Sequence, residues 1–116
     1  MLLKIKISIE KVQARGKLFT FAFDERFVDV LFLYHALERA QKWELKMEQI
    51  AETLFSPDEV IKGHFNRFIA HKIYDKHVLR AVYEYDNNVP VLVTVYYPYA
   101  QRYFQGGLTY EDKIFK

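Results

Sequence analysis

The C-terminal half of the chain alternates apolar and polar side chains between two short turn signals. This pattern constrains the fold more than any other feature of the sequence. Asp75-Lys76 and Asn87-Asn88 divide the stretch 67–96 into three segments, each long enough for a β-strand. Asn tolerates the positive φ that tight loops need. The sequence therefore predicts an antiparallel three-stranded meander.

A two-residue loop at Asp75-Lys76 would also fix the register of the first hairpin. The facing pairs would be Tyr74 with His77, Ile73 with Val78, His71 with Arg80, Ile69 with Val82, and Arg67 with Glu84. Because residues on one face recur at every second position, His71 and Arg80 share a face with Arg67 and Glu84. We expect Arg67 and Glu84 to form a cross-strand ion pair rather than a site.

Alternation also marks the N-terminal third of the chain. Leu2–Val12 predicts a half-buried strand and Leu18–Phe23 a second one, joined by a turn at residues 14–16 into a hairpin. Val28–Leu33 is too short for a helix by itself. It predicts either a short strand or the first turn of the element that follows.

From Tyr34 the apolar residues recur at helical spacing, which predicts one amphipathic helix. A second helix over residues 47–55 ends at Ser56-Pro57, because proline disfavours helical geometry in the residue before it. We expect Trp43, Leu54 and Val93 to be buried together in the core.

The sum predicts an α+β fold: an N-terminal β-hairpin, two helices, then an antiparallel three-stranded meander with the helices on one face of its sheet. The opposite face would be free to carry a site. The length of 116 residues fits a single domain, 1–116, with 1–33 as a hairpin extension of a core at 34–116. We expect Ile114 and Phe115 at the end of the tail to dock on this core.

Composition narrows the function classes. The absence of cysteine excludes a disulfide framework and a thiolate metal site. The four histidines lack the spacing of a strong ligand motif, so we expect neither a metal nor another cofactor. No run approaches the roughly 20 apolar residues of a membrane helix, and no signal peptide is recognisable. These features favour a cytoplasmic protein without membrane contact. The net charge of +2 gives only weak support for nucleic-acid binding.

Five short segments carry a family resemblance: HALERA at 35–40, SPDEV at 56–60, LRAVYE at 79–84, VTVY at 93–96, and Arg102-Tyr103. In these segments the chain resembles a domain-of-unknown-function family of small bacterial and archaeal proteins. That family is similar in layout to BrnT toxins and, more remotely, to RelE and ParE toxins. The resemblance covers residues 34–116. It implies a metal-independent ribonuclease acting on messenger RNA and neutralised by an antitoxin protein.

Metal-free RNA cleavage needs a base for the 2′-hydroxyl, fixed cations for the phosphorane-like transition state, and an acid for the leaving oxygen. Arg80, placed on a strand, is the best candidate for the cation. His35 or His71 is the candidate base, since unperturbed histidine titrates near neutral pH. Structural readings remain open: Arg80 could pair with an acidic side chain, and His35 could simply pack at the start of its helix.

Contacts to RNA would come from basic and aromatic side chains near this centre. Arg39 lies one helical turn beyond His35 and shares its face. Tyr97 or Tyr103 could stack on a base or donate a proton. The predicted RNA-binding residues are Arg39, Lys72, Tyr97, Arg102 and Tyr103.

Two functions therefore stay open. The first is a toxin-like ribonuclease or RNA-binding protein, with RNA, an antitoxin and a second copy of the chain as candidate partners. The alternative is a non-catalytic protein-interaction module of the same fold, including a form whose ancestral activity is lost. Fold likeness by itself does not decide between them.

Overall fold

The computed structural model describes residues 4–107, 109–112 and 114. In these residues the chain forms seven strands, two α-helices and one 3₁₀ turn. Their bounds are β1 Lys6–Val12, β2 Gly16–Phe23, β3 Arg26–Leu33, α1 Tyr34–Lys42, α2 Met47–Phe55, β4 Glu59–Lys62, β5 Phe68–Tyr74, β6 His77–Asp86, β7 Val89–Tyr96 and η1 Ala100–Arg102.

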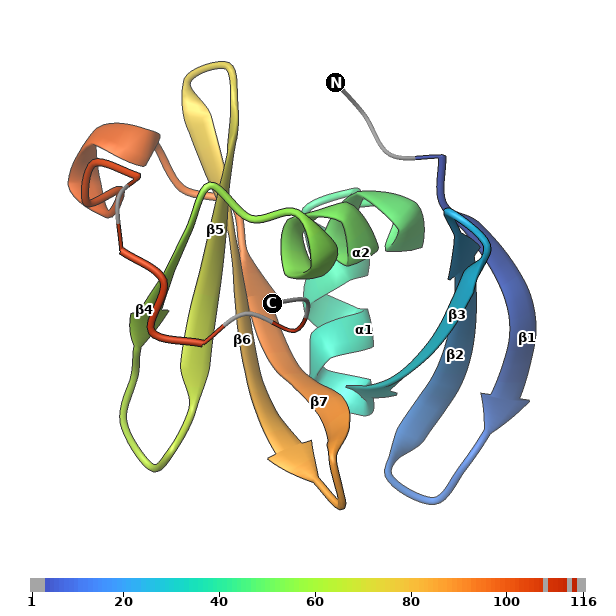
Figure 1. The fold of residues 1–116 in the computed structure, drawn as a ribbon. Coiled ribbons are helices and arrows are strands. Elements are labelled where there is room, and N and C mark those ends of the chain that lie inside the picture. The colour runs from blue at the N-terminus through green and yellow to red at the C-terminus, as the bar shows by residue number, and fades with distance from the viewer. Residues whose placement is uncertain (1–3, 108, 113, 115–116) are drawn as a thin grey trace.

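All seven strands belong to one mixed sheet in the order β1-β2-β3-β7-β6-β5-β4 (Figure 1). Neighbouring strands are antiparallel except β3 and β7, which pair in parallel where Leu31 and Phe32 face Val91 and Leu92. The predicted architecture of a hairpin, two helices and a separate three-stranded meander is therefore wrong. Strands β3 and β4 were not assigned to the sheet, and β3 joins its two halves.

The missed hairpin between β2 and β3 has a physical explanation. Its turn is Asp24-Glu25, and both residues adopt positive φ, 49° and 59°. Glutamate is not a residue that normally signals such a turn, because positive φ crowds its Cβ. The run 28–33 therefore lacked a visible partner in the sequence. In the fold it lies inside an eight-residue strand that pairs with β2 along its whole length.

The predicted register of the hairpin β5–β6 is confirmed. Tyr74 faces His77, His71 faces Arg80, and Ile69 faces Val82. The ion pair between Arg67 Nε and Glu84 Oε1 forms at 3.0 Å, also as predicted. Asp75, Asn87 and Asn88 take up positive φ in the two turns.

The curved sheet wraps around both helices, which fill its concave side (Figure 1). Five phenylalanines dominate the core there: Phe19, Phe21, Phe23, Phe32 and Phe55. Leu54 is buried as predicted and Val93 is half-buried, but the expectation that Trp43 is buried with them is wrong, since this residue is 39% exposed. Trp43 follows the last residue of α1, and the helix buries Ala36 and Ala40 instead.

Residues 99–107 and 109–112, here called the C-terminal strap, run back from the end of β7 to the edge strand β4 (Figure 1). The strap begins at the tip of the β5–β6 hairpin, where Ala100 N donates to Lys76 O at 2.9 Å. It ends along β4, where Val60 exchanges backbone hydrogen bonds with Thr109 and Glu111. Beyond the strap, Ile114 packs against the core as predicted. Phe115 lies outside the described residues.

Candidate functional site

One residue from each of the four strands β4–β7 forms a row across the sheet, on the face opposite the helices. Glu59 faces His71, His71 faces Arg80, and Arg80 faces Tyr96. The alternation of strand side chains places Val60, Ala70, Ala81 and Val95 on the other face, in the core beneath the helices. The same four strands therefore build the core on one side and a polar row on the other.

Hydrogen bonds link three members of the row. His71 Nδ1 lies 2.6 Å from Glu59 Oε2, and Arg80 Nη1 lies 3.1 Å from His71 Nε2. Guanidinium nitrogens only donate, so Nε2 of His71 must be the acceptor, and its proton sits on Nδ1, from which it is donated to Glu59. His71 is therefore a neutral imidazole that holds Arg80 on one side and is held by Glu59 on the other.

The strap completes the environment of Glu59. Backbone N–H groups of Gln105 and Gly107 donate to its carboxylate at 2.8 and 3.1 Å. Burial alone would raise the pKa of Glu59, but the hydrogen bonds from His71, Gln105 and Gly107 outweigh it and the pKa lies below its ordinary value. Glu59 is therefore a buried carboxylate.

The pKa of His71 also lies below its ordinary value. Burial is the main cause, and the positive charge of Arg80 adds to it, while the hydrogen bond and the charge of Glu59 act in the opposite direction. Burial likewise lowers the pKa of Arg80. Its guanidinium remains charged at neutral pH because its ordinary value lies above about 12. The row thus carries one cation, Arg80, beside a neutral imidazole, His71.

Arg80 opens onto a pocket of about 210 Å³, here called the Arg80 pocket, lined by Trp43, Arg80, Tyr96, Tyr97, Pro98 and Tyr103. The Tyr103 ring stacks on the guanidinium, with 4.2 Å from Arg80 Cζ to the ring centroid. Trp43, Tyr96 and Tyr103 are each about 40% exposed. Lys42 Nζ lies 5.4 Å from the Trp43 ring and adds a second cation at the rim.

The structure brings together four of the predicted site residues. Arg80 and His71 are in contact, Tyr103 stacks on Arg80, and Tyr97 lines the same pocket. His71, however, is fully buried and both of its ring nitrogens are engaged, so its geometry suits positioning Arg80 rather than touching a ligand.

The other predicted residues lie elsewhere. His35 is exposed in the first turn of α1, eight residues before Trp43, which is about 12 Å along a helix axis. Arg39 lies half-way between the two. Lys72 Nζ donates to Ser56 O at 2.7 Å, at the C-terminal end of α2 on the helix side of the sheet. Arg102 is exposed in η1, next to Tyr103 but not on the pocket wall.

Sequence reasoning missed Glu59, Trp43, Tyr96 and His77. Glu59 could have been found, because it would face His71 if residues 58–62 were taken as a strand that pairs with β5. His77 is stacked between Tyr97 and Tyr99, at 4.8 and 4.7 Å between ring centroids. No pattern in the sequence signals this stack, because it depends on the path of the chain after β7.

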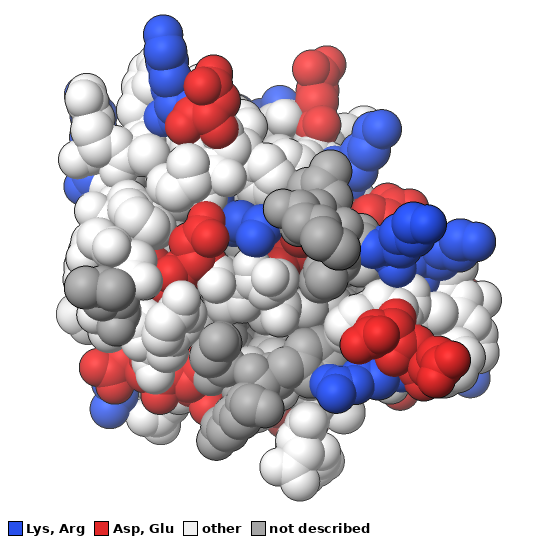
Figure 2. Space-filling view, turned by 45° about the horizontal axis from the view of Figure 1, so that its top comes forward, with Lys and Arg blue, Asp and Glu red and all other residues white. Residues whose placement is uncertain are grey.

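Charge of both signs is interspersed over the face shown in Figure 2, without a broad basic surface. Among the described residues, no group of three or more His, Cys, Asp or Glu side chains could hold a metal ion. Nor does any described helix have the length and apolarity needed to span a membrane.

Residues 32–97 match the family described as Domain of unknown function (DUF4258). The matched range spans both helices and β4–β7, including Glu59, His71 and Arg80, and it stops before the strap. No curated protein and no solved structure matches the chain.

Proposed function

The chain belongs to the DUF4258 family, a domain of unknown function, and we propose that it binds single-stranded RNA in the Arg80 pocket and cleaves it without a metal ion. One observation carries the proposal: exposed aromatic side chains surround a guanidinium that is fixed from below by two buried residues.

Binding would use both components of the pocket. The planar guanidinium of Arg80 can donate two parallel hydrogen bonds to a phosphate. Trp43 and Tyr97 offer aromatic surface on which a base can stack, which is the usual way single strands are held without strong sequence preference. Tyr103, now stacked on Arg80, is a second stacking partner for a base or is displaced by the phosphate.

Cleavage would use the fixed position of Arg80. In the reaction the 2′-oxygen attacks the adjacent phosphorus, a P–O2′ bond forms and the P–O5′ bond breaks. Negative charge grows on the phosphate oxygens, and a cation that is already in place stabilises it without reorganisation. We assign His71 and Glu59 the role of holding Arg80. The hydroxyl of Tyr96 or Tyr103 would give its proton to the leaving 5′-oxygen and take up the 2′-hydroxyl proton in its place, so that one proton moves from the 2′-oxygen to the 5′-oxygen and the tyrosine is restored.

Arg80→Ala tests both steps. A fluorescently labelled single-stranded RNA would be followed by anisotropy for affinity and by gel electrophoresis for cleavage. Turnover should fall far more than affinity, because a transition-state contact is felt mainly in the rate. Arg15→Ala is the matched control, since Arg15 is exposed in the β1–β2 turn and pairs with Asp86. Cleavage should persist with chelator and leave a 2′,3′-cyclic phosphate.

Three outcomes would contradict the proposal. Folded protein that binds no RNA at low salt removes it entirely. Cleavage that chelator abolishes removes the metal-independent step. Cleavage that is equal in wild type and Arg80→Ala indicates a contaminating nuclease.

Trp43→Ala tests the stacking surface separately. Loss of one stacked base costs about 1–3 kcal/mol of binding free energy. Because Trp43 lies at the rim of the fold, thermal unfolding of the variant should stay close to that of the wild type. An unchanged RNA affinity would mean that no base lies on Trp43.

A second candidate function, protein–protein interaction, is favoured by the outer face of the N-terminal strands. Phe27 is 70% exposed there, opposite Ala22 of β2. A shallow hollow of about 230 Å³ lies close by, and its apolar lining includes Leu18, Leu31 and Val91. A second copy of the chain or an antitoxin protein would bury Phe27. Sedimentation at rising concentration tests the homodimer, which Phe27→Asp should weaken; a monomer at every concentration removes it.

A further inference from the structure

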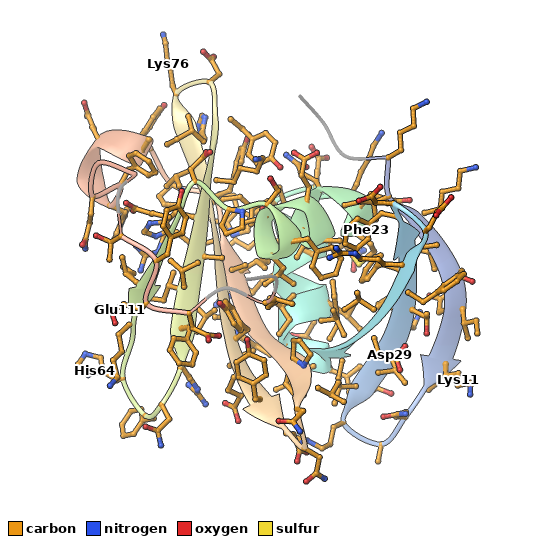
Figure 3. All side chains as sticks on the ribbon, viewed as in Figure 1. Lys11, Phe23, Asp29, His64, Lys76 and Glu111 are labelled. Carbon is orange, nitrogen blue, oxygen red and sulfur yellow. The ribbon has the colours of Figure 1, made fainter. Side chains whose placement is uncertain are left out.

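A second hollow lies next to the Arg80 pocket, at the tip of the β5–β6 hairpin. It has a volume of about 400 Å³ and is lined by Lys76, Tyr99 and Gln101; we call it the Lys76 hollow. Tyr99 is 57% exposed. Lys76 extends from the hairpin tip, at the end of β5 opposite to His64 (Figure 3). Within the described part of the chain, no ion pair engages Lys76.

Backbone hydrogen bonds hold the two walls of this hollow together. Val78 N donates to Pro98 O, and Ala100 N donates to Lys76 O, both at 2.9 Å. His77 and Tyr99 also face each other as an antiparallel bridge. The segment after β7 therefore pairs with the first residues of β6. These backbone hydrogen bonds fix the walls of the hollow.

A stack of three rings connects the hollow with the Arg80 pocket. His77 and Tyr97 are almost parallel, at 5° between ring planes, and His77 and Tyr99 differ by 25°. Two rings cannot share one face of an imidazole at these distances, so the tyrosines lie on opposite faces of His77. Tyr97 lines the Arg80 pocket and Tyr99 lines the Lys76 hollow. Each end of the stack thus belongs to one of the two depressions.

The two depressions repeat the same chemistry. Each combines a cation with aromatic surface, Arg80 with Tyr97 in one and Lys76 with Tyr99 in the other. This is the repeating requirement of a single-stranded nucleic acid, which presents a phosphate and a base at each step. The amide of Gln101 can both donate to and accept from the edge of a base.

We infer that the Lys76 hollow is a second nucleotide subsite for the same RNA strand, with a base on Tyr99 and a phosphate at Lys76. This inference rests on the proposed function and extends it: the site holds at least two consecutive nucleotides. A mononucleotide then uses the Arg80 pocket alone.

The test compares a nucleoside 3′-monophosphate with a trinucleotide, by calorimetry, on wild type and on Tyr99→Ala. The trinucleotide carries 2′-deoxyribose at its first and second positions, whose 2′-oxygens would otherwise attack the two phosphodiesters, so it cannot be cleaved. Loss of the Tyr99 stack should weaken trinucleotide binding by about 5- to 150-fold and leave mononucleotide binding unchanged. Lys76→Ala should weaken trinucleotide binding less and reduce its dependence on salt, because one phosphate contact is lost.

Matched controls come from distant parts of the chain. Phe65→Ala removes an exposed aromatic at the far end of β5, and Lys11→Ala removes an exposed lysine of β1. Both should bind either ligand as wild type does. Thermal unfolding of each variant confirms that it is folded.

The possible failures are distinguishable. Wild-type protein that binds neither ligand removes the proposed function and the subsite together. Wild-type protein that binds RNA, while Tyr99→Ala leaves trinucleotide affinity unchanged, removes the subsite alone. An equal loss for both ligands also overturns it, since Tyr99 would then belong to the first pocket. Competition by poly-glutamate of matched charge as strong as that of the trinucleotide would assign the hollow to an acidic peptide instead.

Discussion

On strand β6, Leu79 and Arg80 are neighbours in sequence and lie on opposite faces of the sheet. Leu79 is fully buried beneath the helices, in the apolar core. Arg80 is half-buried on the other face, in a row held by hydrogen bonds and covered by the strap. The apolar face tolerates the replacement of one apolar side chain by another of similar volume. The polar face depends on donors and acceptors that match, so even an isosteric change is felt there.

The largest expected effect is on the apolar face. Leu79→Ala should lower the free energy of unfolding by about 2–5 kcal/mol, because the helices cannot fully close the cavity that it leaves. Urea denaturation measures this loss. Val82→Ala, on the other face of the same strand and half-buried, is the control and should lose clearly less. Equal losses would mean that the two faces are packed alike.

Glu59→Gln tests the polar face with almost no change of volume. The carboxylate accepts from His71, Gln105 and Gly107, and an amide can replace only part of this acceptance. We expect a loss of about 1–3 kcal/mol of stability. The backbone amides of Gln105 and Gly107 should exchange hydrogen faster, because their acceptor is weakened.

The control for this variant is Glu111→Gln, an exposed position on the strap (Figure 3). Slow exchange at Gln105 and Gly107 in Glu59→Gln would show that the strap is held independently of the row. The strap would then have no link to the position of Arg80.

These two faces also explain what the sequence could and could not predict. The two-residue turn at Asp75-Lys76 predicted the register of β5–β6, and with it the pairing of His71 with Arg80. It could not place Glu59, since β4 has only four residues and its partner is chosen by tertiary contacts. Trp43 was expected in the core because large aromatics are usually buried, yet it follows the end of α1, where no strand covers it completely.

The joining of the two halves of the sheet was equally hidden. Leu31 and Phe32 of β3 meet Val91 and Leu92 of β7 across about sixty intervening residues, and parallel pairing leaves no turn signal in the sequence. The strap was hidden for a related reason. Its contacts to Glu59 come from backbone N–H groups, which every sequence offers except at proline.

Acid should weaken the polar row, because His71 titrates there and holds Arg80. The pKa of His71 lies below its ordinary value of about 6.5, through burial and the neighbouring charge of Arg80. The unfolded chain therefore binds this proton more readily than the folded one. The stabilisation is fully present above the ordinary value and is lost as the pH falls through the folded pKa.

We therefore expect unfolding free energy to fall as the pH drops below about 6.5. Protonation would place an N–H of His71 against an N–H of Arg80, which also removes the contact that positions the guanidinium. Urea midpoints measured from pH 7.5 to 5 check this, with His71→Asn as the variant that lacks the titrating group. If wild type and His71→Asn lose unfolding free energy in parallel between pH 7.5 and 5, His71 is not the source of the loss.

The smallest expected effect lies at the far end of the same polar face. Arg67 and Glu84 form their ion pair at 3.0 Å, but their side chains are 39% and 34% exposed, so water screens the attraction. A double-mutant cycle with Arg67→Ala and Glu84→Ala should give a coupling of only about 0.2–1 kcal/mol, falling further at high salt. A coupling as large as the stability lost in Glu59→Gln would mean that polar contacts at the exposed end of this face are as strong as those at its buried end. A small one would show that the polar face is strong only where the strap excludes water.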